Sequence, residues 1–108
     1  RAALAAAEEV AALDGVDVLF VGPTDLSHVL GVPGRLDEQA YRDAVRSVGQ
    51  AARRQGKAAG VLVWAPTDLE RYAEEGYRFF ALSSDGGILS RAARAAVSDS
   101  RELLQRYD

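Results

Sequence analysis

The stretch "VLFVGPTDLSHVLGVPG", residues 18–34, shares the letters P-T-D-L with "GVLVWAPTDLERYAEEG", residues 60–76. In both places the four letters follow a short apolar run. A run of this length, rich in β-branched residues and closed by a turn signal, predicts a strand that is covered on both faces. The repeat therefore predicts two strand exits of one kind, and it raises the question of whether Asp25 and Asp68 have the same role.

Helical and strand patterns alternate along the rest of the chain. One predicted helix carries the stripe Tyr41, Ala44, Val45, Val48 and Ala52, which recurs at helical spacing. The predicted helices cover residues 1–13, 37–56, 67–76 and 88–108 (the last with a possible break at 98–100), the predicted strands cover residues 16–21, 58–63 and 78–83, and residues 22–36 are expected to be irregular. This alternation predicts an α/β fold whose strands are parallel and joined by right-handed crossovers.

Three strand–helix units are too few to close a (β/α)8 TIM barrel, which takes about 250 residues. We expect residues 1–108 to be the last three βα units of such a barrel, as the C-terminal part of a single domain that is incomplete as given. The sequence has no initiating Met, so we expect it to be either processed or a piece of a longer protein. A small open three-stranded sheet is the alternative.

The composition excludes several classes of function. The sequence contains no cysteine, which rules out disulfides and zinc–thiolate sites and is consistent with a cytoplasmic location. The net charge is −3 with scattered arginines, so we expect no nucleic-acid partner. No apolar run approaches the roughly 20 residues of a membrane span. A small-molecule or protein partner is the better expectation.

The second P-T-D-L copy has a local explanation. Thr67 and Glu70 have the spacing of a capping box, in which each side chain accepts a hydrogen bond from the other residue's amide. Asp68 then lies in the first turn of a helix, where the helix dipole favours a negative charge. We expect Asp68 to be structural.

The first copy lacks this explanation, because Ser27 stands where the capping box needs a glutamate. Connections of about two to six residues suffice between a strand and a helix, so the longer stretch 22–36 suggests a function. Ligands of parallel α/β folds bind at the carboxyl ends of the strands, and Gly22 would let a ligand approach the backbone closely. Pattern alone leaves two roles open for Asp25, a functional one and the capping of a loop.

The segment "VDVLFVGPTDLSHVLGVPG", residues 16–34, also resembles the signature of a known family. This is the HpcH/HpaI family of divalent-metal-dependent pyruvate aldolases, which is related to citrate lyase beta subunits. Its members carry a strand followed by G-P-x-D-L-[SA] and then L-G-x-P-G. "GKAAGVLV" (56–63) and "RFFALSSDGGILSRAAR" (78–94) resemble later segments of the family, so the resemblance covers essentially the whole chain.

The resemblance implies a (β/α)8 barrel, usually assembled into homo-oligomers, that reversibly cleaves a 4-hydroxy-2-oxo acid to pyruvate and an aldehyde. It implies a bound magnesium, manganese or cobalt ion that polarises the ketone and stabilises the enolate formed on cleavage. By this match Asp25 is a metal ligand and the backbone of Gly22, Pro23 and Thr24 lines the pyruvate pocket. Leu62 matches a residue at the aldehyde end, and Ser84, with Asp85, matches the rim at the last strand.

Other parts of the family's site have no match in this chain. The family's second metal ligand, a glutamate, precedes a segment resembling residues 1–10, and its proton-transferring histidine and substrate-binding arginine belong to earlier strands. We therefore expect the catalytic residues in the missing N-terminal part, and we expect residues 1–108 alone to be inactive. The alternative is a non-catalytic truncated homologue that acts as an assembly or partner-docking module.

Four further features are assigned as follows. His28 is expected on the surface of a loop. Lys57, the only lysine, precedes a predicted strand and so lies at the wrong end for a Schiff-base aldolase. Trp64 is expected at a rim or interface. The segment 84–87 ("SDGG") precedes a helix as an anion site does, and a phosphate-binding barrel of other chemistry is a further alternative.

Overall fold

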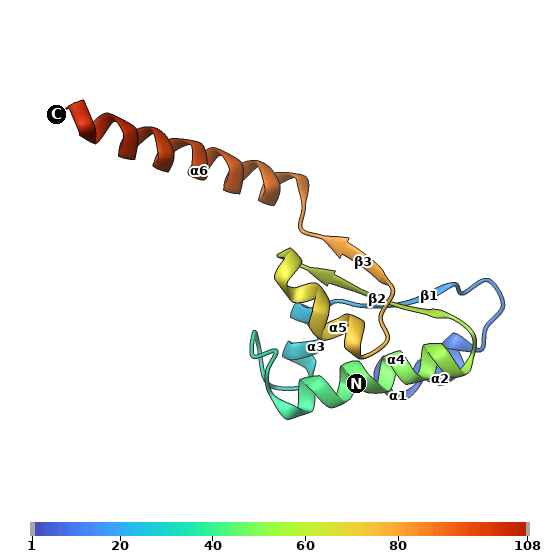
Figure 1. Ribbon diagram of the computed structural model, residues 1–108. Helices are drawn as coiled ribbons and strands as arrows, with labels where there is room; N and C mark the ends of the chain where they lie inside the picture. The colour runs from blue at the N-terminus through green and yellow to red at the C-terminus, as the bar shows by residue number, and fades with distance from the viewer. Residues whose placement is uncertain (1, 108) are drawn as a thin grey trace.

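The computed structural model describes residues 2–107 and contains one sheet of three parallel strands. The strands are β1 (Val18–Val21), β2 (Ala58–Val63) and β3 (Phe79–Leu82), in the order β1-β2-β3 (Figure 1). Val18 pairs with Ala58 and Gly60 pairs with Phe79, so the three strands leave the sheet at one common edge. The predicted parallel α/β arrangement is confirmed.

The helices are joined to these strands by short connections. They are α1 (Ala2–Ala5), α2 (Ala7–Ala11), α3 (Pro23–Val29), α4 (Gln39–Arg54), α5 (Leu69–Glu74) and α6 (Asp85–Leu104), with 3-10 turns η1 (Pro66–Asp68) and η2 (Gln105–Tyr107). Helices α2 and α4 pack against each other and against β1, and α4 also packs against β2. One face of the sheet is therefore covered by helices.

The core lies between this face and the helices. Successive residues of a strand point to opposite faces, and the side chains directed at the helices are buried: Leu19, Val21, Ala59, Val61 and Val63. The predicted stripe on α4 is buried against them. Helix α5 joins the core through Tyr72, whose hydroxyl lies 2.9 Å from that of Tyr41. The apolar stripe read from the sequence is thus what seats α4 on the sheet.

The opposite face of the sheet is covered by no helix in the part of the chain that the structure describes. Phe20 and Phe79 project from this face, each about half exposed, and their rings meet edge to face at 6.0 Å. They meet over Gly60, where a Cβ would lie 2.9 Å from the Phe20 ring and 3.0 Å from the Phe79 ring. Gly60 therefore provides the space in which β1 and β3 contact each other across β2.

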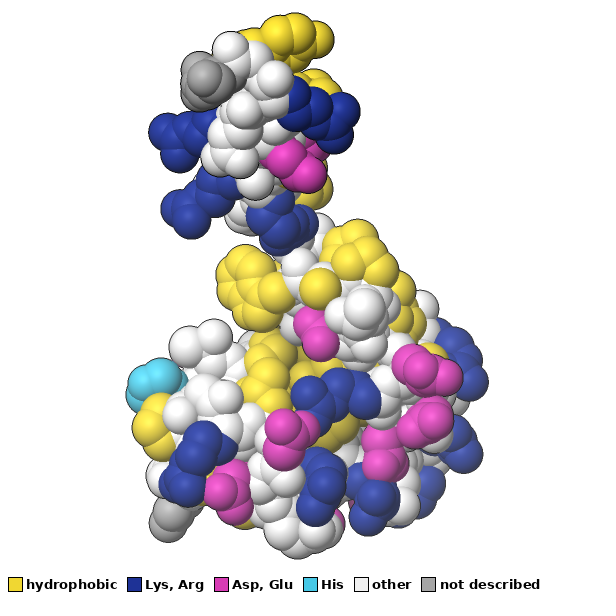
Figure 2. Space-filling view, turned by 60° about the vertical axis from the view of Figure 1, so that its left-hand side comes forward, with side chains coloured by type: hydrophobic (Ala, Val, Ile, Leu, Met, Phe, Trp, Pro, Cys, Tyr) yellow, Lys and Arg dark blue, Asp and Glu magenta, His cyan; other side chains and the backbone are white. Residues whose placement is uncertain are grey.

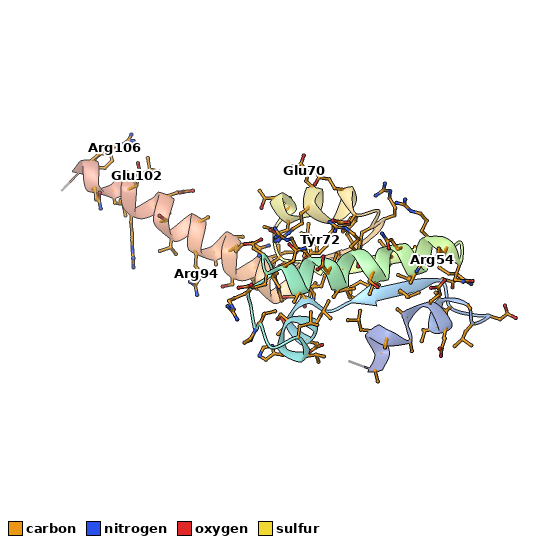
Figure 3. All side chains as sticks on the ribbon, turned by 90° about the horizontal axis from the view of Figure 1, so that it is seen from below. Arg54, Glu70, Tyr72, Arg94, Glu102 and Arg106 are labelled. Atoms are coloured by element: carbon orange, nitrogen blue, oxygen red, sulfur yellow. The ribbon has the colours of Figure 1, made fainter. Side chains whose placement is uncertain are left out.

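Helix α6 projects from the rest of the molecule as an arm (Figure 1). None of its residues is buried, and the chain extends 64 × 29 × 22 Å. Arg94 and Glu102 lie along the arm, away from the sheet and the helices that cover it (Figure 3). Hydrophobic side chains gather where the body narrows toward the arm (Figure 2). None of the helices in residues 2–107 has the length and hydropathy needed to cross a membrane.

Residues 23–29 correct the sequence prediction, because they form helix α3 where an irregular stretch was expected. Pro23 has the fixed φ that the first helical position requires, and its missing N–H costs nothing there. The amide of Leu26 donates to the carbonyl of Gly22 at 2.9 Å, which closes the first turn. The irregular connection is therefore shorter than predicted and lies between α3 and α4.

The last helix also differs from its prediction. It begins at Asp85 rather than near Ile88, and it continues without a break through residues 98–100. Ser84 caps its start by accepting a hydrogen bond from the Gly87 amide at 3.0 Å. The Ser100 hydroxyl donates to the carbonyl of Ala96 at 2.7 Å, so this serine is satisfied within the helix. At the other end of the chain, the helix expected over residues 1–13 is divided at Ala6 and ends at Ala11.

Candidate active-site edge of the sheet

The carboxyl ends of the three strands bring the candidate site residues to one edge of the sheet. Gly22 follows β1, Trp64 lies one residue after β2, and Ser83 and Ser84 follow β3. In parallel α/β folds this edge carries the functional groups, because the loops that leave the strands converge there. Lys57 immediately precedes β2 and so lies at the opposite edge, as predicted.

Asp25 is the third residue of α3 and is exposed to solvent. Its carboxylate makes no hydrogen bond or ion pair with any residue in the range 2–107. The side chain folds back over the strand end, so that Oδ2 would lie only 3.2 Å from a Cβ on Gly22. The carboxylate therefore caps no loop in the described part of the chain and is available as a ligand.

The backbone beneath Asp25 is held by a buried serine. The Ser27 hydroxyl donates to the carbonyl of Thr24 at 2.9 Å and accepts from the amide of Gly34 at 3.1 Å. Ser27 is fully buried, and its own carbonyl accepts from the amide of Val32 at 2.9 Å. These bonds attach the loop after α3 to the turn that carries Asp25. The sequence analysis missed this role, although the serine follows directly from the P-T-D-L-S motif.

His28 lies on the surface, as predicted, but on helix α3 rather than on a loop. Its Nδ1 is 2.8 Å from the carbonyl of Thr24, which makes Nδ1–H the donor of this hydrogen bond. The imidazole thus supports the same carbonyl as Ser27. A local structural role explains its position.

Gly22 and Asp25 line a groove of about 450 Å³ that runs along the outer edge of β1, between α1–α2 and α3. Most of the other lining side chains are apolar, among them Leu4, Val10 and Leu26. Of the other predicted residues, Pro23 is buried and Thr24 is exposed. Leu62 lies half-buried on the uncovered face of the sheet, in register with Ala81. The structure therefore brings Gly22 and Asp25 together and leaves Leu62 and Ser84 outside this groove.

One of the two glycines after β3 has a local explanation. Ser84 uses its hydroxyl to cap α6, and Ser83 has the positive φ of 58° that few non-glycine residues adopt. The Ser83 hydroxyl accepts from Arg91 Nη1 at 3.1 Å. A Cβ on Gly87 would lie 2.7 Å from the Ser83 hydroxyl, so a side chain at this position would displace that hydroxyl from its bond to Arg91. These contacts account for Ser84 and Gly87, whereas Gly86 has neither a positive φ nor an atom within 4 Å of a built Cβ.

Asp68 has a structural role, but not through the predicted capping box. Its Oδ2 accepts a hydrogen bond from the amide of Ala65 at 3.2 Å, which closes turn η1. Thr67 caps no helix, because the chain first forms a 3-10 turn at Pro66 and the helix proper begins at Leu69. The prediction of a Thr67–Glu70 pair is therefore wrong, and the carboxylate of Asp68 replaces it.

A divalent metal fits Asp25 as one of its ligands, since hard cations prefer carboxylate oxygens. Residues 2–107 contain no group of three or more His, Cys, Asp or Glu side chains that could hold a metal ion by themselves. The remaining ligands of such an ion would have to come from beyond the described residues or from water.

Comparison with known proteins agrees with this geometry. The family model described as HpcH/HpaI aldolase/citrate lyase matches residues 1–92. A hydroxypyruvate/pyruvate aldolase of Delftia acidovorans is 41% identical over 98 residues, which cover 91% of this chain and 36% of that protein. A 5-keto-4-deoxy-D-glucarate aldolase of Enterobacter sp. is 37% identical over 93 residues, covering 86% and 36% of the two chains.

A solved structure shares the fold. The crystal structure of an HpcH/HpaI aldolase/citrate lyase family protein from Burkholderia cenocepacia superimposes with a TM-score of 0.85 at 36% identity, covering 91% of this chain and 38% of that one. The chain thus spans a little over a third of the length of the relatives that it matches. On the match of its sequence and the agreement of its fold, the chain belongs to the HpcH/HpaI aldolase/citrate lyase family.

Proposed function

We propose that residues 1–108 form the C-terminal part of one aldolase-type barrel domain, and that the full-length protein is a carbon–carbon lyase. The reaction is the reversible cleavage of a 4-hydroxy-2-oxo acid to pyruvate and an aldehyde. The names of the relatives support this class, since they are aldolases of hydroxypyruvate and pyruvate or of 5-keto-4-deoxy-D-glucarate.

The observation that carries the proposal is the free carboxylate of Asp25. It stands at the carboxyl end of β1, is exposed, and makes no hydrogen bond or ion pair within residues 2–107. A structural aspartate at a strand exit finds a local donor, as Asp68 does at the amide of Ala65. We therefore assign Asp25 as a ligand of a divalent ion such as Mg²⁺, Mn²⁺ or Co²⁺.

The other predicted residues are assigned positions around the substrate. When bound, a divalent cation supplies a Lewis acid for the keto oxygen of a 2-oxo acid. The backbone of Gly22, Pro23 and Thr24 lines the pyruvate side of the pocket, while Leu62 contributes to the aldehyde side and Ser84 to its rim. Ser27 and His28 hold the Thr24 carbonyl and so keep the turn in one conformation.

The full-length protein is further proposed to be a homo-oligomer. Helix α6 buries none of its residues and exposes large apolar side chains, among them Leu89, which is 71% exposed. In a chain that spans about a third of its relatives' length, such side chains are available both to the rest of the barrel and to another subunit. The support for the oligomer is therefore the resemblance to a family whose members usually assemble into homo-oligomers.

The test compares Asp25→Asn with Asp14→Asn in the full-length protein. Both changes remove one exposed carboxylate, but Asp14 lies before β1 at the opposite edge of the sheet. The exchange of pyruvate methyl protons with deuterated water is followed by NMR as Mn²⁺ is added. We expect Asp25→Asn to abolish the metal-dependent exchange and Asp14→Asn to retain it. Equal exchange in the two variants would refute the assignment of Asp25.

A further inference from the structure

We propose that Gly22 is a positioning residue, which keeps open the space that the Asp25 carboxylate occupies. The proposal rests on the proposed function, since it takes Asp25 as a ligand of a divalent cation. This role is different from forming a turn, and it is additional to lining the substrate pocket with backbone atoms.

The backbone conformation of Gly22 gives no reason for a glycine. Its φ of −92° and ψ of 106° lie in the extended region that every L-residue adopts. Gly22 differs in this from five glycines that do have a positive φ, namely Gly15, Gly31, Gly34, Gly56 and Gly76. Alanine at position 22 would therefore be unstrained in its backbone.

The space around Gly22 does give a reason for a glycine at this position. A Cβ built there would have three near neighbours, and all three belong to the Asp25 side chain, with Oδ2 at 3.2 Å and Cβ and Cγ at 3.9 Å. At Gly49, Gly60 and Gly87 the nearest atoms instead belong to the backbone, to the side chains of Phe20 and Val18, or to serine hydroxyls. Among the described residues, the atom with which a methyl at position 22 competes most closely is therefore an oxygen of the Asp25 carboxylate.

A carboxylate at the end of a side chain can move aside by rotating about its Cα–Cβ and Cβ–Cγ bonds. The fold loses little when it does so, because the Asp25 carboxylate makes no hydrogen bond or ion pair within the described residues. A metal ligand, however, has to hold one position relative to the other ligands. A methyl group on residue 22 would consequently disturb the geometry of the metal site while leaving the fold intact.

The experiment measures Mn²⁺ binding and unfolding separately in the full-length protein. Gly22→Ala is compared with Gly86→Ala, a matched control because Gly86 has no positive φ and no atom within 4 Å of a built Cβ. Binding is measured with Mn²⁺ alone, from the electron paramagnetic resonance signal of the free ion. The free energy of unfolding is measured by urea denaturation without metal.

We expect Gly22→Ala to weaken Mn²⁺ binding about 10-fold, the size that loss of a supporting group has at metal sites. Its metal-free stability should be unchanged or higher, because alanine restricts the unfolded chain. Gly86→Ala should leave Mn²⁺ binding unchanged. In an Asp25→Asn background, Gly22→Ala should cause no further loss, since the displaced carboxylate is already gone.

Two results overturn the inference: wild-type Mn²⁺ affinity in Gly22→Ala, or a loss of stability or folding in that variant, which would make the glycine structural. The failure of the proposed function is distinguishable from both. In that case Asp25→Asn alone binds Mn²⁺ as the wild type does, whatever Gly22→Ala does.

Discussion

At the scale of single residues, Ser27 shows how a small polar side chain fixes the site without taking part in it. The hydroxyl is fully buried and uses its donor and acceptor capacity at once, toward Thr24 and Gly34. Neither partner is adjacent in sequence. The position of the Asp25 turn thus depends on a hydrogen bond to a loop that follows it by several residues.

Replacing Ser27 by alanine should destabilise the protein by about 1–3 kcal/mol, because the Gly34 amide loses its acceptor and the Thr24 carbonyl loses one donor. The measurement is urea denaturation of the full-length protein. Ser47→Ala is the matched control, since Ser47 is exposed on α4. A change of less than about 0.5 kcal/mol for Ser27→Ala, as expected for a surface site, would contradict the buried network.

The aspartates of the two P-T-D-L copies also differ at the scale of single residues. Both aspartates follow a strand, and both lie in the first turn of helical structure. Asp68 accepts a hydrogen bond from the Ala65 amide, whereas Asp25 accepts none within residues 2–107. Identical letters therefore have different roles because only one of the two carboxylates finds a donor three residues before it.

At the scale of elements, α4 lies very close to the turn between α5 and β3. A Cβ on Gly49 would be 2.8 Å from the carbonyl oxygen of Glu75 and 3.3 Å from the Tyr77 ring. The guanidinium of Arg46 also makes two hydrogen bonds to the Glu75 carboxylate, at 2.8 and 3.1 Å. The glycine lets the two elements approach, and the ion pair lies beside it.

Gly49→Ala should therefore destabilise the protein by about 1–3 kcal/mol, although alanine is favoured over glycine in a helix interior by about 1 kcal/mol. The obstructing atom is a backbone carbonyl, which cannot rotate away. Thermal or urea unfolding checks the prediction, with Gln50→Ala on the exposed side of the same helix as the control. Increased stability in Gly49→Ala would show that the contact is not tight.

The tyrosines between α4, α5 and β3 predict an alkaline limit to stability. Burial raises the pKa of both Tyr41 and Tyr77 far above the usual value, and for Tyr41 the hydrogen bond with Tyr72 raises the pKa further. The folded protein thus keeps protons that the unfolded chain releases above about pH 10. The contribution of these two tyrosines to the free energy of unfolding is therefore complete below about pH 10 and decreases as the pH rises above that value.

The expected loss is about 1.4 kcal/mol per pH unit for each such tyrosine, above about pH 10. Urea unfolding across this range measures the slope. Tyr77→Phe should reduce the slope, whereas Tyr107→Phe should not, because Tyr107 is 88% exposed. A flat stability profile up to about pH 11 would contradict the role of burial.

Much at this scale could be predicted from the sequence. The strands and α4 follow from short apolar runs and from a helical stripe, which are local patterns. Helix α3 was missed because a proline followed by polar residues reads as a turn, and only the bond from Leu26 to Gly22 shows that a helix begins there. The contacts of Ser27, Gly22 and Gly49 depend on which segments meet in space, and periodicity does not contain that information.

At the scale of the whole molecule, α6 determines the shape, because it adds a projecting rod to an otherwise small body. Its apolar side chains include Leu89 and Val97, about two turns apart and each at least half exposed. The charged residues Arg94 and Glu102 also lie along it, and Arg106 lies in the turn η2 that follows it (Figure 3). A mixed surface of this kind is open to contact with the rest of the full-length chain as well as with the second subunit that we propose.

Changing Leu89 and Val97 to serine should shift the full-length protein toward smaller species, since the changes remove apolar surface from the arm. Sedimentation velocity measures the shift. Ser90→Ala with Ser98→Ala keeps the same spacing on exposed neighbouring positions and should leave assembly unchanged. A wild-type protein that sediments as a monomer would refute the proposed oligomer.

The position of Trp64 has a practical consequence. It is the single tryptophan of the sequence, it is half exposed, and it follows β2 at the edge of the sheet that carries Asp25. Indole emission changes in colour and brightness with the water around the ring. Within residues 1–108, the light that this residue emits therefore reports on the surroundings of that one edge of the sheet.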